Sequence, residues 1–152
     1  MENNADITKE TPLKEALNLA SPCRCGSCNN GCKYGSGIMV GKDAENIASF
    51  LKITKSELEK EYIEEVEQFG KKFQRPKLIR KEKPYGKCVF FDEEKGCKIH
   101  EAKPLQCRTS IACKDYGEKL SLWFMHNYLI DEKDEKSKKE YEIYKKSGGK
   151  IL

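Results

Sequence analysis

The residues of this sequence whose type and spacing could do chemistry are eight cysteines in two groups. The first group lies within a ten-residue stretch, and the second is spread over a longer one. Thiolate sulfur is a soft ligand that suits zinc in tetrahedral sites and iron in iron–sulfur clusters. We therefore expect metal ligation, and the candidate ligands are Cys23, Cys25, Cys28 and Cys32 in the first group and Cys88, Cys97, Cys107 and Cys113 in the second.

The spacing of the thiols leaves open whether they form one metal centre or two. Cys25-x2-Cys28 is ordinary for zinc and for iron, but Cys23-x-Cys25 argues against one tetrahedral zinc that holds all four local thiols. The distal spacings, x8, x9 and x5, match no standard zinc finger. Either one four-thiolate site draws on both groups and leaves some cysteines over, or two neighbouring sites use all eight, with His100 or Asp92 as spare ligands.

The identity of the metal is also open, between an iron–sulfur cluster, [4Fe–4S] being one form, and zinc. The irregular spacing suits the cavity of a cluster better than a zinc knuckle, and we favour iron–sulfur for that reason. Disulfides are the alternative to metal. Residues 1–6 lack the basic and apolar regions of a signal peptide, which predicts a cytoplasmic protein whose thiols stay reduced.

The composition indicates a thin core. Of 152 residues, 36% are charged and 38% are hydrophobic, so a bound metal would supplement apolar burial by converting binding energy into folding energy. We expect one compact domain, mainly α with a small β-hairpin, around an irregular Cys-rich core. The expected parts are a flexible N-terminus over 1–12, the cysteine-cluster metal-binding domain over 13–130, and a charged C-terminal helix or tail over 131–152.

The elements that must position the thiols follow from apolar spacing and from turn residues. Thr54-Lys55-Ser56-Glu57 is a capping box, and apolar residues at helical spacing follow it as far as Gly70. Asp43 is a plausible N-cap for the preceding helix. The expected helices cover 12–20, 43–51, 54–70 and 120–130, with a hairpin over 87–100 that turns at Gly96 and a helical turn that Pro104 opens. Glycines 26, 31, 35 and 37 are expected to supply positive-φ and close-approach positions around the centre.

The charge pattern bears on partners. The 54–70 segment is rich in Glu, whereas 71–87 carries eight Lys and Arg residues against Glu82 alone. We favour internal pairing or solvation of this basic run over a nucleic-acid surface, because the only aromatic residues in it are Phe73 and Tyr85. The expected partner is another protein, bound through a charged surface. Nucleic acid is not favoured, and no segment is long and apolar enough to cross a membrane.

Two blocks of the sequence resemble a known family. Cys25-Gly26-Ser27-Cys28 matches its C-G-x-C loop, and the distal block is matched by 88–92, 96–101 and 104–109, which end in Cys107-Arg108-Thr109. The chain thus resembles the YkgJ-like cysteine-cluster proteins, also called the CxxCxxCC or zinc- or iron-chelating domain family. The resemblance spans about residues 21–113. The sequence departs from the family pattern at Cys23 and Cys32 in the first loop. After the distal block, Ser110-Ile111 replaces the usual Phe-Pro, and Cys113 is an additional cysteine.

The resemblance implies chelation of zinc or iron, with Cys25, Cys28, Cys88, Cys97 and Cys107 as the ligands that match the pattern. Two classes of function stay open. One is a non-catalytic module for binding, electron transfer or adaptor roles. The other is a small enzyme or subunit that uses the cluster in redox or methyl-transfer chemistry. We favour the module, because the only histidines, His100 and His126, are a thin supply of acid and base groups.

Overall fold

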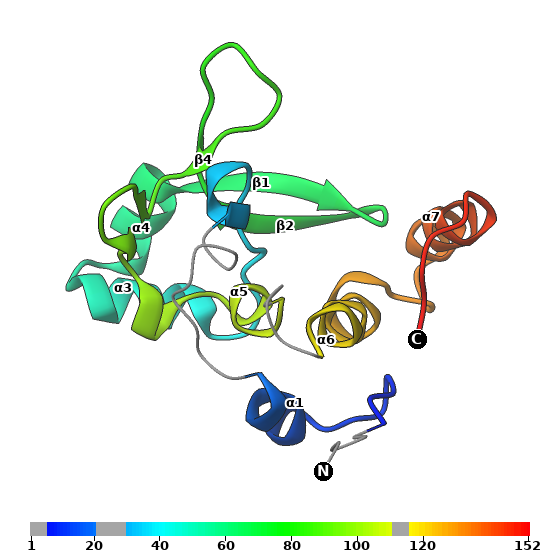
Figure 1. Ribbon diagram of the computed structural model, residues 1–152. Coiled ribbons are helices and arrows are strands. Elements are labelled where there is room, and N and C mark those ends of the chain that lie inside the picture. Colours follow the sequence, from blue (N-terminus) through cyan, green and yellow to red (C-terminus); the bar gives the residue numbers. More distant parts are fainter. Residues whose placement is uncertain (1–5, 21–29, 111–115) are drawn as a thin grey trace.

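In the part of the chain that the structure describes, short helices and three antiparallel strand pairs build the fold (Figure 1). The computed structural model describes residues 6–20, 30–110 and 116–152. The helical elements are α1 (Leu13–Leu19), η1 (Gly31–Lys33), α3 (Asp43–Leu51), α4 (Lys55–Tyr62), η2 (His100–Ala102), α5 (Leu105–Thr109), α6 (Gly117–Phe124), the π-helix η3 (Met125–Leu129) and α7 (Glu135–Lys146). The strands are β1 (Ile63–Gln68), β2 (Lys71–Pro76), β3 (Leu78–Ile79), β4 (Lys87–Cys88), β5 (Phe91–Asp92) and β6 (Gly96–Cys97).

The predicted fold class is confirmed, since the chain is mainly helical with small antiparallel pairs in a single domain. The sequence prediction holds best where the signal is local. Thr54 Oγ1 accepts a hydrogen bond from the Glu57 N–H at 3.1 Å, which is half of the expected capping box. The expected hairpin turn is also present, since Asp92 pairs with Gly96, which has a φ of 79°. Cys88 lies outside this hairpin, however, because its strand pairs with β3.

The predicted helix over 54–70 is wrong in its second half. α4 ends at Tyr62, and the chain continues as β1, which pairs with β2 from Ile63↔Pro76 to Gln68↔Lys71. Phe69 and Gly70 have φ values of 48° and 71°, so they form a two-residue hairpin turn of the type that suits a twisted strand pair. Gly70 therefore serves the turn of a hairpin and does not end a helix. The far end of this hairpin reaches α7, where Lys136 pairs with Glu67 at 3.0 Å (Figure 1).

Two groups of buried residues form the core. One lies around α3, α4 and the strand segments and includes Ile47, Leu58 and Phe90. The other lies around α6 and includes Trp123 and Phe124. The segment 35–40 runs between them, because Ile38 belongs to the second group and its neighbour Met39 to the first. The same segment forms one wall of the cysteine site described below.

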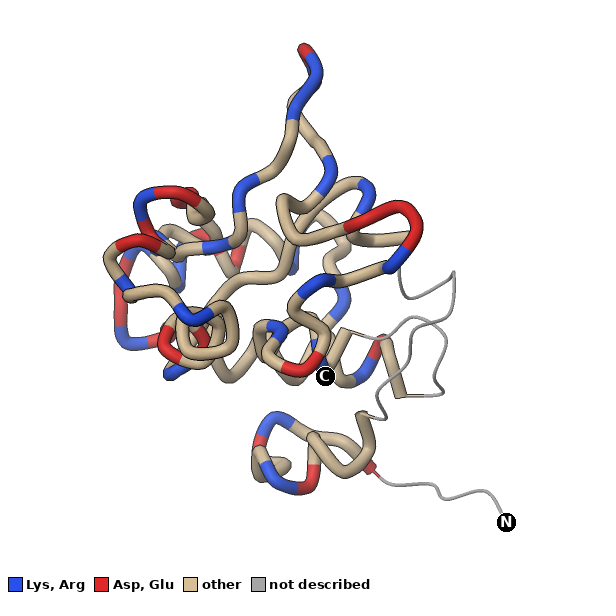
Figure 2. The backbone as a smooth tube through the Cα atoms, turned by 90° about the vertical axis from the view of Figure 1, so that its left-hand side faces the viewer, with Lys and Arg blue, Asp and Glu red and all other residues tan. Residues whose placement is uncertain are grey.

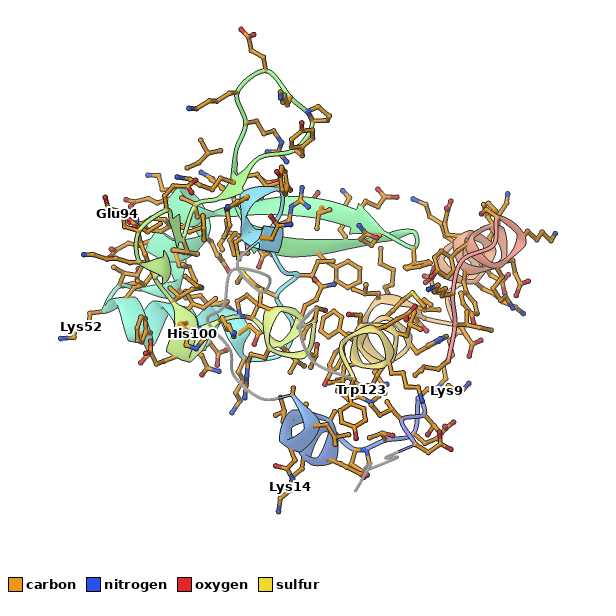
Figure 3. The ribbon with its side chains drawn as sticks, in the orientation of Figure 1. Lys9, Lys14, Lys52, Glu94, His100 and Trp123 are labelled. Carbon is orange, nitrogen blue, oxygen red and sulfur yellow. The ribbon has the colours of Figure 1, made fainter. Side chains whose placement is uncertain are left out.

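The N-terminal segment packs against α6. Ile7 is only 4% exposed, and Trp123 Nε1 donates to the Thr11 carbonyl at 2.8 Å (Figure 3). The Asn127 side chain donates to the Lys9 carbonyl at 3.0 Å. These contacts attach residues 7–11 to the core. Within the described ranges, no helix has both the length and the apolar character that crossing a membrane requires.

Candidate metal centre

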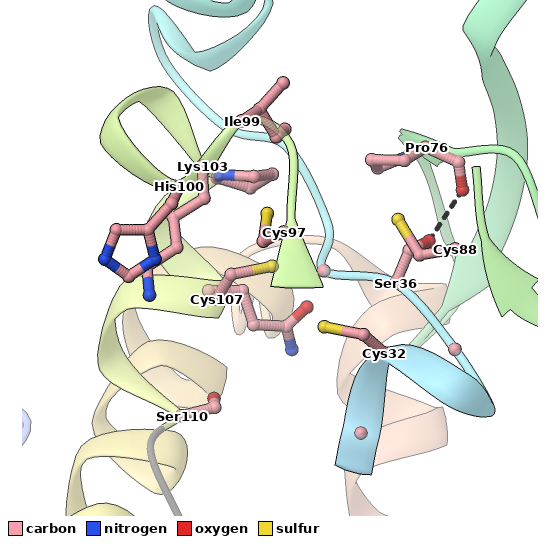
Figure 4. Close-up of a pocket in the computed structure, with 15 residues that line it drawn as sticks. Cys32, Ser36, Pro76, Cys88, Cys97, Ile99, His100, Lys103, Cys107 and Ser110 are labelled. Atoms are coloured by element: carbon pink, nitrogen blue, oxygen red, sulfur yellow. Dashed lines mark hydrogen bonds between the residues drawn. The ribbon is translucent and has the colours of Figure 1, made fainter. Parts of the chain in front are cut away.

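Four thiols from four different elements line one cavity. Cys32 comes from η1, Cys88 from β4, Cys97 from β6 and Cys107 from α5, and the cavity has a volume of about 310 Å³ (Figure 4). Both cysteine groups of the sequence thus converge in space, although 55 residues separate Cys32 from Cys88. No disulfide joins the cysteines that the structure describes.

The backbone segment 35–40, which forms one wall of the cavity, is held in place by hydrogen bonds to two other parts of the fold. The Ser36 hydroxyl donates to the Pro76 carbonyl at 2.6 Å, as Figure 4 shows, and the Ile38 N–H donates to Gln106 Oε1 at 2.6 Å. The Met39 N–H donates to the Gln74 carbonyl at 2.8 Å. The segment is therefore tied to the end of β2 on one side and to α5 on the other, so the spacing between Cys32 and Cys107 is set by hydrogen bonds and not by packing alone.

Strand pairing positions Cys88 and Cys97. Cys88 pairs with Leu78, Cys97 pairs with Phe91, and the Lys98 N–H donates to the Phe90 carbonyl at 2.8 Å. Backbone hydrogen bonds from Phe90 and Phe91 also reach the Cys88 sulfur. Amide donors of this kind stabilise a negatively charged sulfur, and they tune the reduction potential where the sulfur is a cluster ligand.

Helix α5 presents Cys107 to the cavity. The carboxylate of Asp43 at the start of α3 accepts from the Leu105 N–H at 3.1 Å and from the Val40 N–H at 2.8 Å. Asp43 was expected as the N-cap of its own helix, but Lys42 occupies that position and Asp43 joins three segments instead. Its buried carboxylate satisfies an N-terminal amide of α5, which otherwise lacks an intrahelical partner. Asp43 therefore fixes the helix that carries Cys107.

Glycine at position 37 lets the backbone reach the sulfur of Cys107. A Cβ on Gly37 would overlap with the Cys107 Sγ and approach the Cys107 amide nitrogen to 3.2 Å. The backbone of Gly37 also forms a hydrogen bond with the Cys107 sulfur. The expected close-approach role thus holds for Gly37. It is wrong for Gly31 and Gly35, where an added Cβ meets no atom within 4 Å.

Burial favours the protonated form of three thiols in the cavity, so a cation that binds there must displace protons. Burial raises the pKa of Cys88 to about 12. Burial also raises the pKa of Cys107, and the neighbouring thiols add to this effect. The pKa of Cys32 is raised as well, first by burial and then by the nearby Cys97 thiol, whereas the positive charge of Lys103 lowers it. The thiolate forms of these cysteines are therefore disfavoured unless a cation binds. Because metal ligands must be deprotonated, a cation would supply the missing positive charge and release protons on binding.

The donor set fits a thiolate-bound metal group. All four sulfurs face one cavity, yet among the described residues no three His, Cys, Asp or Glu side chains are grouped closely enough to hold a single metal ion. Cysteine thiolates bind zinc ions and iron–sulfur clusters alike, so this donor set agrees with either.

The other residues that the sequence analysis nominated fall into two sets. Cys23, Cys25, Cys28 and Cys113 lie outside the described residues. His100 lines the cavity but lies outside the group of four sulfurs (Figure 4). Asp92 was expected as a spare ligand, but its Oδ1 accepts from the Glu94 and Lys95 N–H groups at 2.9 and 2.8 Å in the β5–β6 turn. It does not line the cavity.

Three residues of the site were not among the candidates that the sequence indicated. Lys103 and Gln106 line the cavity, and Ser36 links it to β2. Gln106 directly precedes Cys107 in the distal block, and Lys103 lies between the matched ranges 96–101 and 104–109, so the block itself could have drawn attention to both. Ser36 lies between Gly35 and Gly37, and only its contact with Pro76 reveals its role.

Comparison with known proteins identifies the family of the chain. A family model described as "CxxCxxCC: Putative zinc- or iron-chelating domain" matches residues 23–146, which is more than half of the chain. Comparison with curated proteins and with solved structures returns no match. The match includes all four thiols of the cavity and extends past the last cysteine into α7. The chain therefore belongs to the CxxCxxCC family, whose described property is the chelation of zinc or iron.

Proposed function

We propose that this protein holds an iron–sulfur cluster through Cys32, Cys88, Cys97 and Cys107 and works as an electron-transfer or adaptor module. The observation that carries the proposal is the arrangement of these four thiols, from four separate elements, around one cavity. Four cysteine thiolates are the usual ligand set of [2Fe–2S] and [4Fe–4S] clusters. Such a cluster supplies one-electron redox chemistry when bound.

The position of η1 supports an electron-transfer role. Cys32 is half-buried, whereas its neighbours Gly31, Lys33 and Tyr34 are exposed. One ligand of the proposed centre therefore lies next to the protein surface, where a partner can approach it. Three other residues that line the cavity, Cys88, Ile99 and Pro104, are buried. Backbone hydrogen bonds to the sulfurs of Cys88 and Cys107 would adjust the reduction potential.

The supply of acid and base groups supports a module over an enzyme. Of the described residues that line the cavity, only His100 and Lys103 could accept or donate protons besides the thiols. A single-domain enzyme would need such groups within hydrogen-bonding reach of a substrate. The other lining residues are glycines, prolines, Ile99, Gln106 and two serines, which shape the cavity and do not titrate near neutral pH.

The test is the metal content and spectrum of protein purified without oxygen. We expect a brown protein with a broad absorption near ~400 nm, iron and acid-labile sulfide in equal amounts, and bleaching on reduction that reverses on reoxidation. A colourless, air-stable protein with zinc and no sulfide would replace the cluster with a structural zinc site. A folded protein with neither metal and with its thiols paired in disulfides would contradict both.

A further inference from the structure

The loop between β3 and β4 projects from the molecule (Figure 1). Its shape is fixed at the neck, because a Cβ on Gly86 would overlap with the Ile79 carbonyl, so the two arms are in close backbone contact there. Glu82, at its end, has a φ of 61°. The loop therefore has a defined turn.

The loop holds basic charge that the fold does not use. Lys72, Arg75 and Arg80, from the same basic run of the sequence, form ion pairs with Glu64 and Glu65. Within the described ranges no ion pair involves Lys81 and Lys83 of the loop or Lys87 at the start of β4. Figure 2 shows basic segments along the loop and one short acidic segment at its end. Of the two expected alternatives, internal pairing applies to Lys72, Arg75 and Arg80, and the exposed Lys81 and Lys83 agree with solvation.

Exposed aromatic and apolar side chains lie beside these lysines. Tyr34 is 57% exposed, Tyr85 44% and Ile79 46%, and the rings of the two tyrosines are 5.9 Å apart. Tyr34 follows η1, which carries Cys32, and Lys87 precedes Cys88. Amphipathic aromatic residues among cations are typical of protein-binding surfaces, where the aromatic rings supply contact area and the charges steer association.

We propose that this surface, formed by Tyr34, Ile79, Lys81, Lys83, Tyr85 and Lys87, docks an acidic protein. Two contacts favour a protein over single-stranded nucleic acid. The tyrosine rings are inclined at 60° to each other, and the Lys83 ammonium lies 5.5 Å from the centre of the Tyr85 ring. The rings therefore offer no parallel faces for successive bases. The proposal goes beyond the metal centre, and it places the partner against the wall that carries Cys32 and Cys88.

The test compares two variants that remove the same charge. K81Q/K83Q/K87Q and the control K133Q/K138Q/K139Q, in the charged region around α7, each lower the net charge from +4 to +1. The probe is a fluorescent acidic peptide of about twenty residues in which Glu and Asp alternate with Leu and Phe. We expect K81Q/K83Q/K87Q to weaken binding of the peptide about tenfold and the control to weaken it less than about twofold. Lysines strengthen binding only where they lie against acidic residues of the bound peptide.

Two further variants sharpen the result. K81Q/K83Q leaves β4 untouched and should weaken binding in the same direction. Y34A/Y85A should weaken binding while leaving its salt dependence unchanged, because it removes contact area and no charge. Equal losses in the loop variant and its control, absence of peptide binding, or tighter binding of an oligothymidylate of equal charge would each overturn the proposal. Metal content is expected to be unchanged in every variant, so failure of the proposed metal centre would be seen separately.

Discussion

Gly37 lies against Cys107 so closely that its backbone hydrogen-bonds the Cys107 sulfur and leaves no room for a side chain. Replacement of Gly37 by Ala should therefore displace Cys107 or the segment 35–40. We expect G37A to lose most of its bound metal and to unfold at lower denaturant, since overpacking of this kind costs about 1–3 kcal/mol. Metal analysis and urea unfolding would measure the two effects.

The matched control is Gly35→Ala. Gly35 also lines the cavity, but an added Cβ there meets no atom within 4 Å. We expect G35A to keep its metal and its stability. If both variants lost metal equally, the contact between Gly37 and Cys107 would not explain the loss.

The role of Asp43 leads to a second prediction. Its carboxylate accepts from the N–H groups of Val40 and Leu105, and Asp43→Ala would leave both amides without this acceptor. We expect the free energy of unfolding to fall by about 2 kcal/mol, with loss of metal because α5 carries Cys107. Asp43→Asn keeps an oxygen that can accept and should cost less. Exposed Glu45 on the same helix is the control, and E45A should leave metal content unchanged.

Glu64 gives a prediction of pH dependence. Hydrogen bonds from Arg80, helped by the Leu78 N–H and by Arg75, lower the pKa of Glu64 from 4.5 to about 2. A carboxyl whose pKa is lowered by folding stabilises the folded state above its unfolded pKa, and that stabilisation is lost as the pH falls toward the folded value. We therefore expect Glu64→Gln to cost about 2 kcal/mol at pH 7 and progressively less below pH 4.5.

Urea unfolding of the wild type and of E64Q at each pH would measure this difference in the free energy of unfolding. An effect of metal loss that is the same in both proteins cancels in the difference. The control is Glu65→Gln, because Glu65 is 65% exposed and lies 3.7 Å from the Lys72 ammonium. We expect E65Q to have little effect at any pH, as is usual for a surface ion pair. A difference for E64Q that stays constant from pH 7 to pH 3 would contradict the assigned role of the carboxylate.

Local signals in the sequence predicted local structure. Thr54 and Glu57 began a helix, and Asp92 and Gly96 flanked a turn, because in each case the deciding hydrogen bond or backbone angle lies within a few residues. Gly70 shows where such reasoning fails. A glycine with positive φ ends a helix or turns a hairpin equally well, and only pairing of 63–68 with 71–76 decides between the two. The cross-strand ion pair between Glu64 and Arg75, at 3.1 Å, belongs to that pairing.

The sequence predicted that cysteines form the metal site, but it did not predict which of the cysteines share the cavity. All four cavity thiols were candidate ligands from the sequence. Cys32, however, departs from the family pattern, which favoured Cys25 and Cys28 as ligands from the first group. Its place in the cavity depends on contacts with distant segments, such as that between Ser36 and Pro76. The same limit applies to Gln106, whose bond to the Ile38 N–H spans 68 residues. Contacts of this kind leave no spacing that a sequence pattern can detect.

The last prediction concerns which thiols act together. If Cys32, Cys88, Cys97 and Cys107 hold one group, replacing any of them with Ser should remove the same metal and lower stability, because part of the folding energy comes from the bound metal. The double variant C32S/C107S should then lose no more metal than either single variant, since residues that share one partner are not additive. Metal analysis of protein purified without oxygen, with an unfolding curve for each variant, would measure both effects.

Two independent centres would give a different pattern. C32S and C107S would each remove part of the metal, and the double variant would remove the sum. Cys25→Ser and Cys28→Ser complete the comparison, because both residues match the family's C-G-x-C loop. Full metal content in C25S and C28S, together with complete loss in C32S, would assign the centre to the four thiols of the cavity. Complete loss in C28S with retention in C32S would instead restore the ligand set that the family pattern implies.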